Sequence, residues 1–153
     1  MTATLTAPGR TAPGRTAPGR TAPGRTAPGR TGSLGAIGVL AAAVASVATT
    51  AVAAAGSAAG ISLDMGGEPI PVLGFGMLTA VFSLVGLAIA AVLARRARHP
   101  QSTFVRTTLV LTALSLIPDV IADASPSTKA LLMTTHLVAA AIVIPAISRR
   151  LAA

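Results

Sequence analysis

Four long apolar stretches dominate the chain, and short polar segments separate them. They predict helices at about 34–61, 70–94, 104–122 and 128–148. Each stretch is close to the ~20 residues that an α-helix needs to cross a bilayer. Because short loops join consecutive spans in opposite directions, the pattern predicts an all-α polytopic membrane protein with four transmembrane helices in an up-down bundle. We expect one transmembrane domain at 34–150 and a disordered N-terminal tail at 1–33.

The composition agrees with this prediction. Apolar residues make up 52% of the chain and charged residues only 10%, whereas soluble domains average about 25% charged residues. Too few polar side chains remain to cover a water-soluble globule. The chain has no cysteine, which excludes disulfides, thiolate metal sites and cysteine nucleophiles.

The basic residues are distributed unevenly along the predicted spans. Eleven of the twelve Lys and Arg residues fall on one side of the four stretches, and only Lys129 falls on the other. Short cytoplasmic loops collect Lys and Arg, so we expect a multi-pass plasma-membrane protein with both termini cytoplasmic. Four arginines after the second stretch are candidate contacts for anionic lipids. They are Arg95, Arg96, Arg98 and Arg106.

The tail repeats the pentamer Thr-Ala-Pro-Gly-Arg five times, at 6–30. Each repeat places Pro before Gly, which cannot sustain a helix, so disorder is expected. Its arginines reinforce insertion with the N-terminus inside, or alternatively tether the tail to anionic head groups. Nucleic-acid binding is not expected, because the tail has no aromatic residue for base stacking.

The first apolar stretch is interpreted as an uncleaved anchor. It follows a basic segment and contains small residues at 57–59, as a cleaved signal peptide would. Its 28 residues far exceed the roughly 7–15 residues of a signal-peptide core.

Small residues on the first two predicted helices are candidates for close helix packing. These residues are Gly56, Gly60, Gly86 and Ala90. Packing within one chain is the preferred interpretation, and homodimerisation is the alternative, because such patterns are common in all membrane helices.

A candidate intramembrane polar site lies between the third and fourth predicted helices. His136 lies about 10 Å below the outer boundary, nearest the level of Ser115, with Thr112 one turn deeper and Asp119 one turn shallower. Intramembrane ionisable groups are costly and often functional. The alternatives are a neutral imidazole bonded to a hydroxyl or carbonyl, with Asp119 marking the helix end, and a His136–Asp119 proton relay.

No metal site or cofactor is expected. One His and one carboxylate supply too few ligands for a metal. Asp64 and Glu68 flank glycines in an outer loop that we expect to be flexible and solvated, where they would bind calcium only weakly.

Three segments carry a resemblance to a known family. They are the Gly/Ala-rich first helix with its Asp64–Glu68 loop, the Arg95-Arg96-Ala97-Arg98 connector, and the closing segment from His136 to Pro145. Together they resemble an actinobacterial-type family of small, alanine-rich, four-helix integral membrane proteins catalogued as a domain of unknown function. The resemblance covers about 34–150 and implies a plasma-membrane four-helix protein without a known activity.

No phosphate loop, nucleophile elbow or dinucleotide fingerprint occurs, so we expect no enzyme. The preferred function is a non-enzymatic accessory or scaffold bundle of the cell envelope, in contact with the lipid bilayer and with a membrane-protein partner. The alternative is a small dimeric transporter or proton-coupled carrier that uses His136 and Asp119.

Overall fold

The computed structural model describes residues 30–152. Residues 1–29, for which the sequence predicts disorder, lie outside the described residues. Four helices are present: α1 (Arg30–Ala58), α2 (Val72–Arg96), α3 (Pro100–Ile121) and α4 (Pro126–Ala152). All four are long and apolar enough to cross a membrane, which confirms the predicted fold class. The first helix begins at Arg30, four residues before the predicted start.

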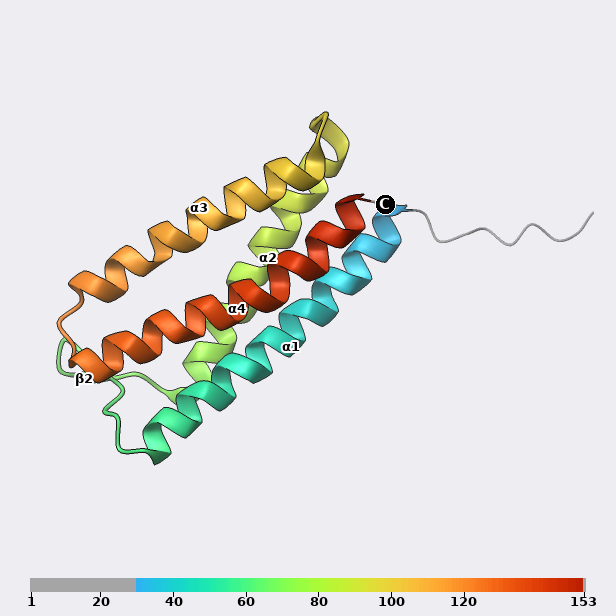
Figure 1. Cartoon of the computed structure of the whole chain (residues 1–153). Helices are drawn as coiled ribbons and strands as arrows, with labels where there is room; N and C mark the ends of the chain where they lie inside the picture. The colour runs from blue at the N-terminus through green and yellow to red at the C-terminus, as the bar shows by residue number, and fades with distance from the viewer. Residues whose placement is uncertain (1–29, 153) are drawn as a thin grey trace, which may run out of the picture.

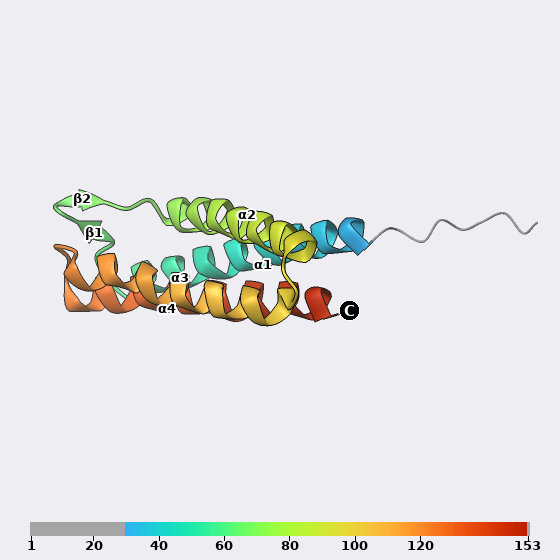
Figure 2. The ribbon, with the colours of Figure 1, turned by 90° about the horizontal axis from the view of Figure 1, so that it is seen from above.

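The helices form an up-down bundle. The start of α1, the α2–α3 connection and the end of α4 lie together at one end (Figure 1). We call it the basic end, and it carries Arg95, Arg96, Arg98, Arg149 and Arg150. The opposite, acidic end holds a β-hairpin beyond the helices (Figure 2). It carries Asp64, Glu68, Asp119 and Asp123.

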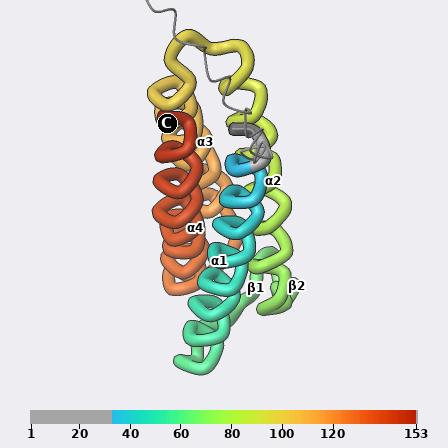
Figure 3. Tube along the Cα trace, turned by 90° about the vertical axis from the view of Figure 1, so that its right-hand side faces the viewer, coloured from blue at the N-terminus to red at the C-terminus, as the bar shows by residue number. Residues whose placement is uncertain are grey.

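Helix α1 packs extensively against both α2 and α4, whereas α3 packs mainly against α4 and less closely against α2. Figure 3 shows α1 beside α2 and α4 along most of its length. The small side chains of α1 allow this central position, because they let neighbouring backbones approach closely. Gly56 is one such contact, since a Cβ atom there would lie 2.8 Å from Cδ2 of Leu131 on α4.

Of the other small residues predicted to pack, Ala90 is fully buried between helices. A Cβ atom at Gly86 or Gly60 would meet nothing within 4 Å. Gly60 instead ends α1 with φ +83°. Its N–H donates to the carbonyl of Ser57, and the N–H of Ile61 donates to the carbonyl of Gly56, each at 3.0 Å. This is a Schellman cap, which needs the left-handed backbone that glycine adopts freely.

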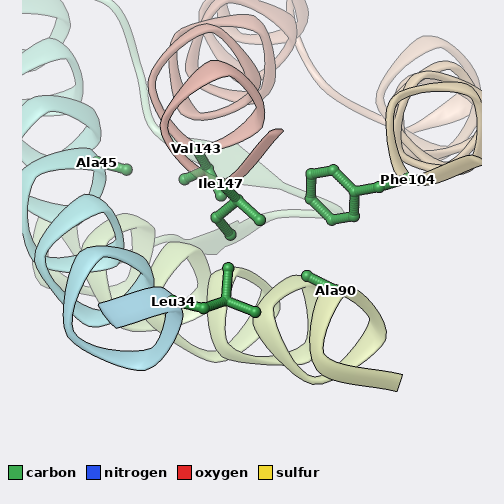
Figure 4. Packing of buried hydrophobic residues seen from close by; sticks show 6 residues of the cluster. All are labelled: Leu34, Ala45, Ala90, Phe104, Val143 and Ile147. Atoms are coloured by element: carbon green, nitrogen blue, oxygen red, sulfur yellow. The ribbon is translucent and has the colours of Figure 1, made fainter. Parts of the chain in front are cut away.

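Two apolar clusters lie toward the two ends of the bundle. The cluster at the basic end joins all four helices (Figure 4) through Leu34, Ala45, Ala90, Phe104, Val143 and Ile147. The cluster at the acidic end contains Ala53, Leu63, Phe75, Leu131 and Leu132. Outward faces are apolar as well, as a bilayer requires, and on α2 they expose Leu73, Met77, Leu78, Val81, Phe82, Val85 and Val92.

Candidate functional site

The segment between α1 and α2 folds into a β-hairpin, where the sequence predicted a flexible loop. Strands β1 (Asp64–Met65) and β2 (Glu68–Pro69) are antiparallel, with Asp64 opposite Pro69 and Met65 opposite Glu68. Gly66 and Gly67 form the two-residue turn with φ of +61° and +82°. Two consecutive positive φ angles define a type I′ turn, which glycine pairs favour because their backbone twist matches that of the strands.

Three contacts hold the hairpin against the helices. The N–H of Gly66 donates to the carbonyl of Asp123 at 2.8 Å. The hydroxyl of Thr128 donates to the carbonyl of Ser62. The Leu63 side chain is buried in the apolar cluster of the acidic end. The hairpin is therefore fixed at its turn and at its base.

The hairpin is nevertheless open to its surroundings. Every residue from 64 to 69 is exposed, and so is Asp123 beside the turn. This arrangement places three acidic side chains on the exposed surface of the acidic end, with Asp64 and Glu68 on opposite faces of the hairpin and Asp123 beside its turn. Fixed geometry together with exposed like charges makes this surface suitable for recognising a cationic partner, because no large ordering entropy opposes binding.

The structure brings Asp119 of α3 and His136 of α4 together. Nδ1 of His136 lies 2.8 Å from Oδ2 of Asp119. The Asp119 side chain is 7% exposed and the His136 side chain 37% exposed. The carboxyl group is thus enclosed between the helices, and the imidazole forms the more accessible side of the pair.

His136 Nδ1 faces a second acceptor, the carbonyl oxygen of Leu132, at 3.1 Å. A carbonyl oxygen can only accept, so the bond to Leu132 forms in the tautomer in which Nδ1 carries the ring proton. The N–H is directed toward Leu132, and the buried Oδ2 of Asp119 has no hydrogen bond of good geometry among the described residues. A small rotation of the ring would aim the N–H at the carboxyl oxygen, a stronger acceptor when ionised.

The other two candidate site residues do not join this pair. The hydroxyl of Ser115 donates to the carbonyl of Thr112 at 2.7 Å, and the hydroxyl of Thr112 donates to the carbonyl of Thr108 at 2.8 Å. Both side chains therefore bond to their own helix. Within residues 30–152, no group of three or more His, Cys, Asp or Glu side chains could hold a metal ion.

Local contacts around the α3–α4 loop set how the two helices that carry the pair meet. The hydroxyl of Ser125 accepts the N–H of Thr128 at 3.2 Å and Pro126 follows it, an N-cap and first-residue combination that starts α4. Nζ of Lys129 donates to the carbonyl of Val120 at 3.0 Å, which satisfies one of the unpaired carbonyls that end α3. These contacts fix the register in which His136 meets Asp119.

An up-down bundle of four apolar helices with polar ends is a polytopic membrane protein, and this class follows from the fold. The chain belongs to DUF6069, a family of unknown function, whose model matches residues 29–153. This match confirms the resemblance seen in the sequence to a family of unknown function. No curated protein and no solved structure matches the chain.

Proposed function

We propose that this protein is a non-enzymatic accessory or scaffold bundle of the cell envelope that presents its β-hairpin to another membrane protein. The observation that supports it most is the fixed and exposed hairpin, held by Gly66 on Asp123 and by Thr128 on Ser62. A loop that only connects two helices needs no such anchoring. The acidic side chains of the hairpin favour a partner with basic residues outside the membrane.

The proposed orientation places the basic end in the cytoplasm of a plasma-membrane protein. Arginines occupy the last turns of both α2 and α4, which end on the same side. Lys129 is the one Lys or Arg at the acidic end among the described residues. The same asymmetry orients most short-looped membrane proteins.

Cysteine labelling tests this orientation cleanly, because the chain has no cysteine of its own. On intact cells, a membrane-impermeant maleimide is expected to label Glu68→Cys in the hairpin and not Gln101→Cys at the start of α3. Deleting 2–29 should leave this pattern unchanged, since the remaining arginines still bias insertion. Labelling of Gln101→Cys instead would reverse the proposed topology.

The hairpin hypothesis predicts which variants lose a partner. After affinity purification in mild detergent, the wild-type protein is expected to carry a stoichiometric second protein. Valine at position 67 cannot easily adopt the φ of +82° that Gly67 has. Gly67→Val should therefore lower the recovery of the second protein at least about fivefold, equivalent to about 1 kcal/mol of binding free energy. The double variant Asp64→Asn, Glu68→Gln should do the same while keeping the turn.

The matched control for these variants is Gly74→Ala on α2, where an added Cβ meets no atom within 4 Å. It should recover the partner at the wild-type level. Equal recovery by all variants would contradict binding through the hairpin. A pure homodimer without any second protein would contradict the accessory function and favour a dimeric proton-coupled carrier.

A second candidate function, a small dimeric proton-coupled carrier, is favoured by the Asp119–His136 pair. A ring nitrogen 2.8 Å from a buried carboxyl oxygen that lacks a well-directed hydrogen bond can exchange a proton with it. Polar pairs of this kind within membrane helices often belong to proton pathways.

A further inference from the structure

A surface groove runs between α1 and α2 in the half of the bundle nearest the basic end. Its volume is about 330 Å³. Six of its seven lining residues are apolar or glycine, and the seventh is an arginine at its end. The lining residues are Leu34, Gly35, Leu84, Leu87, Ala88, Ala91 and Arg95.

Small residues create this groove. Gly35 has no side chain, and a Cβ atom there would meet nothing within 4 Å. Ala88 and Ala91 contribute only methyl groups from α2. One turn further along α1, the Leu87 side chain fills the space beside Gly38 and closes the groove on that side. Leu34 and Leu87 connect its floor to the buried cluster of Figure 4.

The dimensions of the groove match one leaflet of a bilayer. Leu84 is near the middle of α2, and Arg95 is in its last turn, eleven residues later. At 1.5 Å per residue this distance is about 16 Å, close to half of the ~30 Å hydrocarbon core. A chain lying in the groove would extend from the head-group region to the bilayer centre.

No Asp or Glu side chain of residues 30–152 lies near Arg95. The chain has four Asp and Glu residues, and all of them lie at the acidic end, across the membrane from Arg95. No ion pair to Arg95 occurs in the described part of the chain. Arg95 is exposed in the last turn of α2, where its guanidinium group can bind a lipid phosphate in bidentate geometry.

We propose that this groove is a binding site for an anionic phospholipid. One acyl chain lies along Gly35, Ala88 and Ala91, and the phosphate of the head group contacts Arg95. The site needs both halves, an apolar channel of one-leaflet depth and a cation at its mouth. It is independent of the proposed hairpin partner, because it lies at the opposite end of the molecule.

The test measures lipid retained by the full-length protein. Protein extracted from phosphatidylcholine vesicles that contain about one part in five of phosphatidylglycerol is examined by native mass spectrometry in mild detergent. The wild-type protein is expected to retain one phosphatidylglycerol in preference to phosphatidylcholine. Arg95→Gln should lower that retention about fivefold, the effect of one basic residue near the surface.

Two matched controls separate this site from general lipid attraction. Arg96→Gln removes the same charge from the same helix turn, but Arg96 does not line the groove. Gly35→Leu fills the groove, whereas Gly86→Leu adds the same side chain at another open helical glycine outside it. Gly35→Leu should lower retention as Arg95→Gln does, and both controls should retain lipid like the wild type.

Equal retention by Arg95→Gln and Arg96→Gln would overturn the proposal, because the charge would then act without a site. Retention of phosphatidylcholine as strong as that of phosphatidylglycerol would overturn it too. Should Gly35→Leu disturb folding, the comparison of the two arginine variants still decides the question.

Discussion

Replacing Gly76 with leucine is expected to lower the free energy of unfolding by about 2–3 kcal/mol, as overpacking of a tight contact does. A Cβ atom at Gly76 would collide with the hydroxyl of Thr50 and lie 3.2 Å from the carbonyl oxygen of Ser46. Neither atom can easily move, since the Thr50 hydroxyl already donates to the Ser46 carbonyl at 2.8 Å. The added side chain must therefore separate α1 from α2.

This separation would also weaken the nearby bond between the hydroxyls of Thr49 on α1 and Thr79 on α2, now 2.9 Å apart. Reversible unfolding by sodium dodecyl sulfate in mixed micelles measures the loss. Gly74→Leu is the matched control, because it removes a glycine from the same helix where no atom lies within 4 Å. It should change stability by no more than about 0.5 kcal/mol. Equal losses would show that the contact at Gly76 does not limit packing.

Hydropathy predicts the number of helices well and their ends less well. The prediction followed apolar residues, but helices continue into the polar boundary once their caps allow it. Helix α4 begins at Pro126, two residues before the predicted start, because Ser125 caps it. It continues to Ala152 through two arginines that suit the negative end of a helix dipole. The Ser-Pro signal was present in the sequence.

The hairpin was also recognisable from the sequence. Adjacent glycines between two short extended segments favour a type I′ turn, yet glycine was interpreted only as a source of flexibility. What sequence could not supply is the long-range contact of Gly66 with Asp123, 57 residues away. Such contacts depend on how the helices pack, so the anchoring that makes the hairpin a candidate binding surface emerges only from the structure.

The arrangement of the candidate polar site could be predicted only in part from the sequence. Counting turns placed Asp119 one turn from His136, whereas the structure places the two side chains in contact. Side chains on a helix tilt toward its N-terminus, and the N-terminus of α4 is at the acidic end near Asp119. The His136 ring follows this direction, as its bond to the carbonyl of Leu132 shows. Ser115 and Thr112 bond to their own helix, a choice that spacing alone does not determine.

Removing the imidazole of His136 is expected to cost about 2 kcal/mol of stability, because the buried carboxyl group of Asp119 would lose the ring nitrogen that lies 2.8 Å from its Oδ2. A double-mutant cycle with His136→Ala and Asp119→Ala should give a coupling energy of about 1 kcal/mol or more. Thr134→Ala is the control on α4, since its exposed hydroxyl bonds only to the carbonyl of Ala130. It should change stability by less than about 0.5 kcal/mol.

A further variant of the same pair, Asp119→Asn, distinguishes an accessory protein from a carrier. In vesicles with a pH gradient, an accessory protein should conduct no protons beyond the lipid background, so Asp119→Asn and the wild-type protein would behave alike. A carrier should move protons, and Asp119→Asn should lose that flux while remaining folded. Additive losses in the cycle, with no coupling, would show that the 2.8 Å approach of Asp119 and His136 has no energetic consequence. The pair would then not support the carrier function, because a proton shared between two groups requires them to interact.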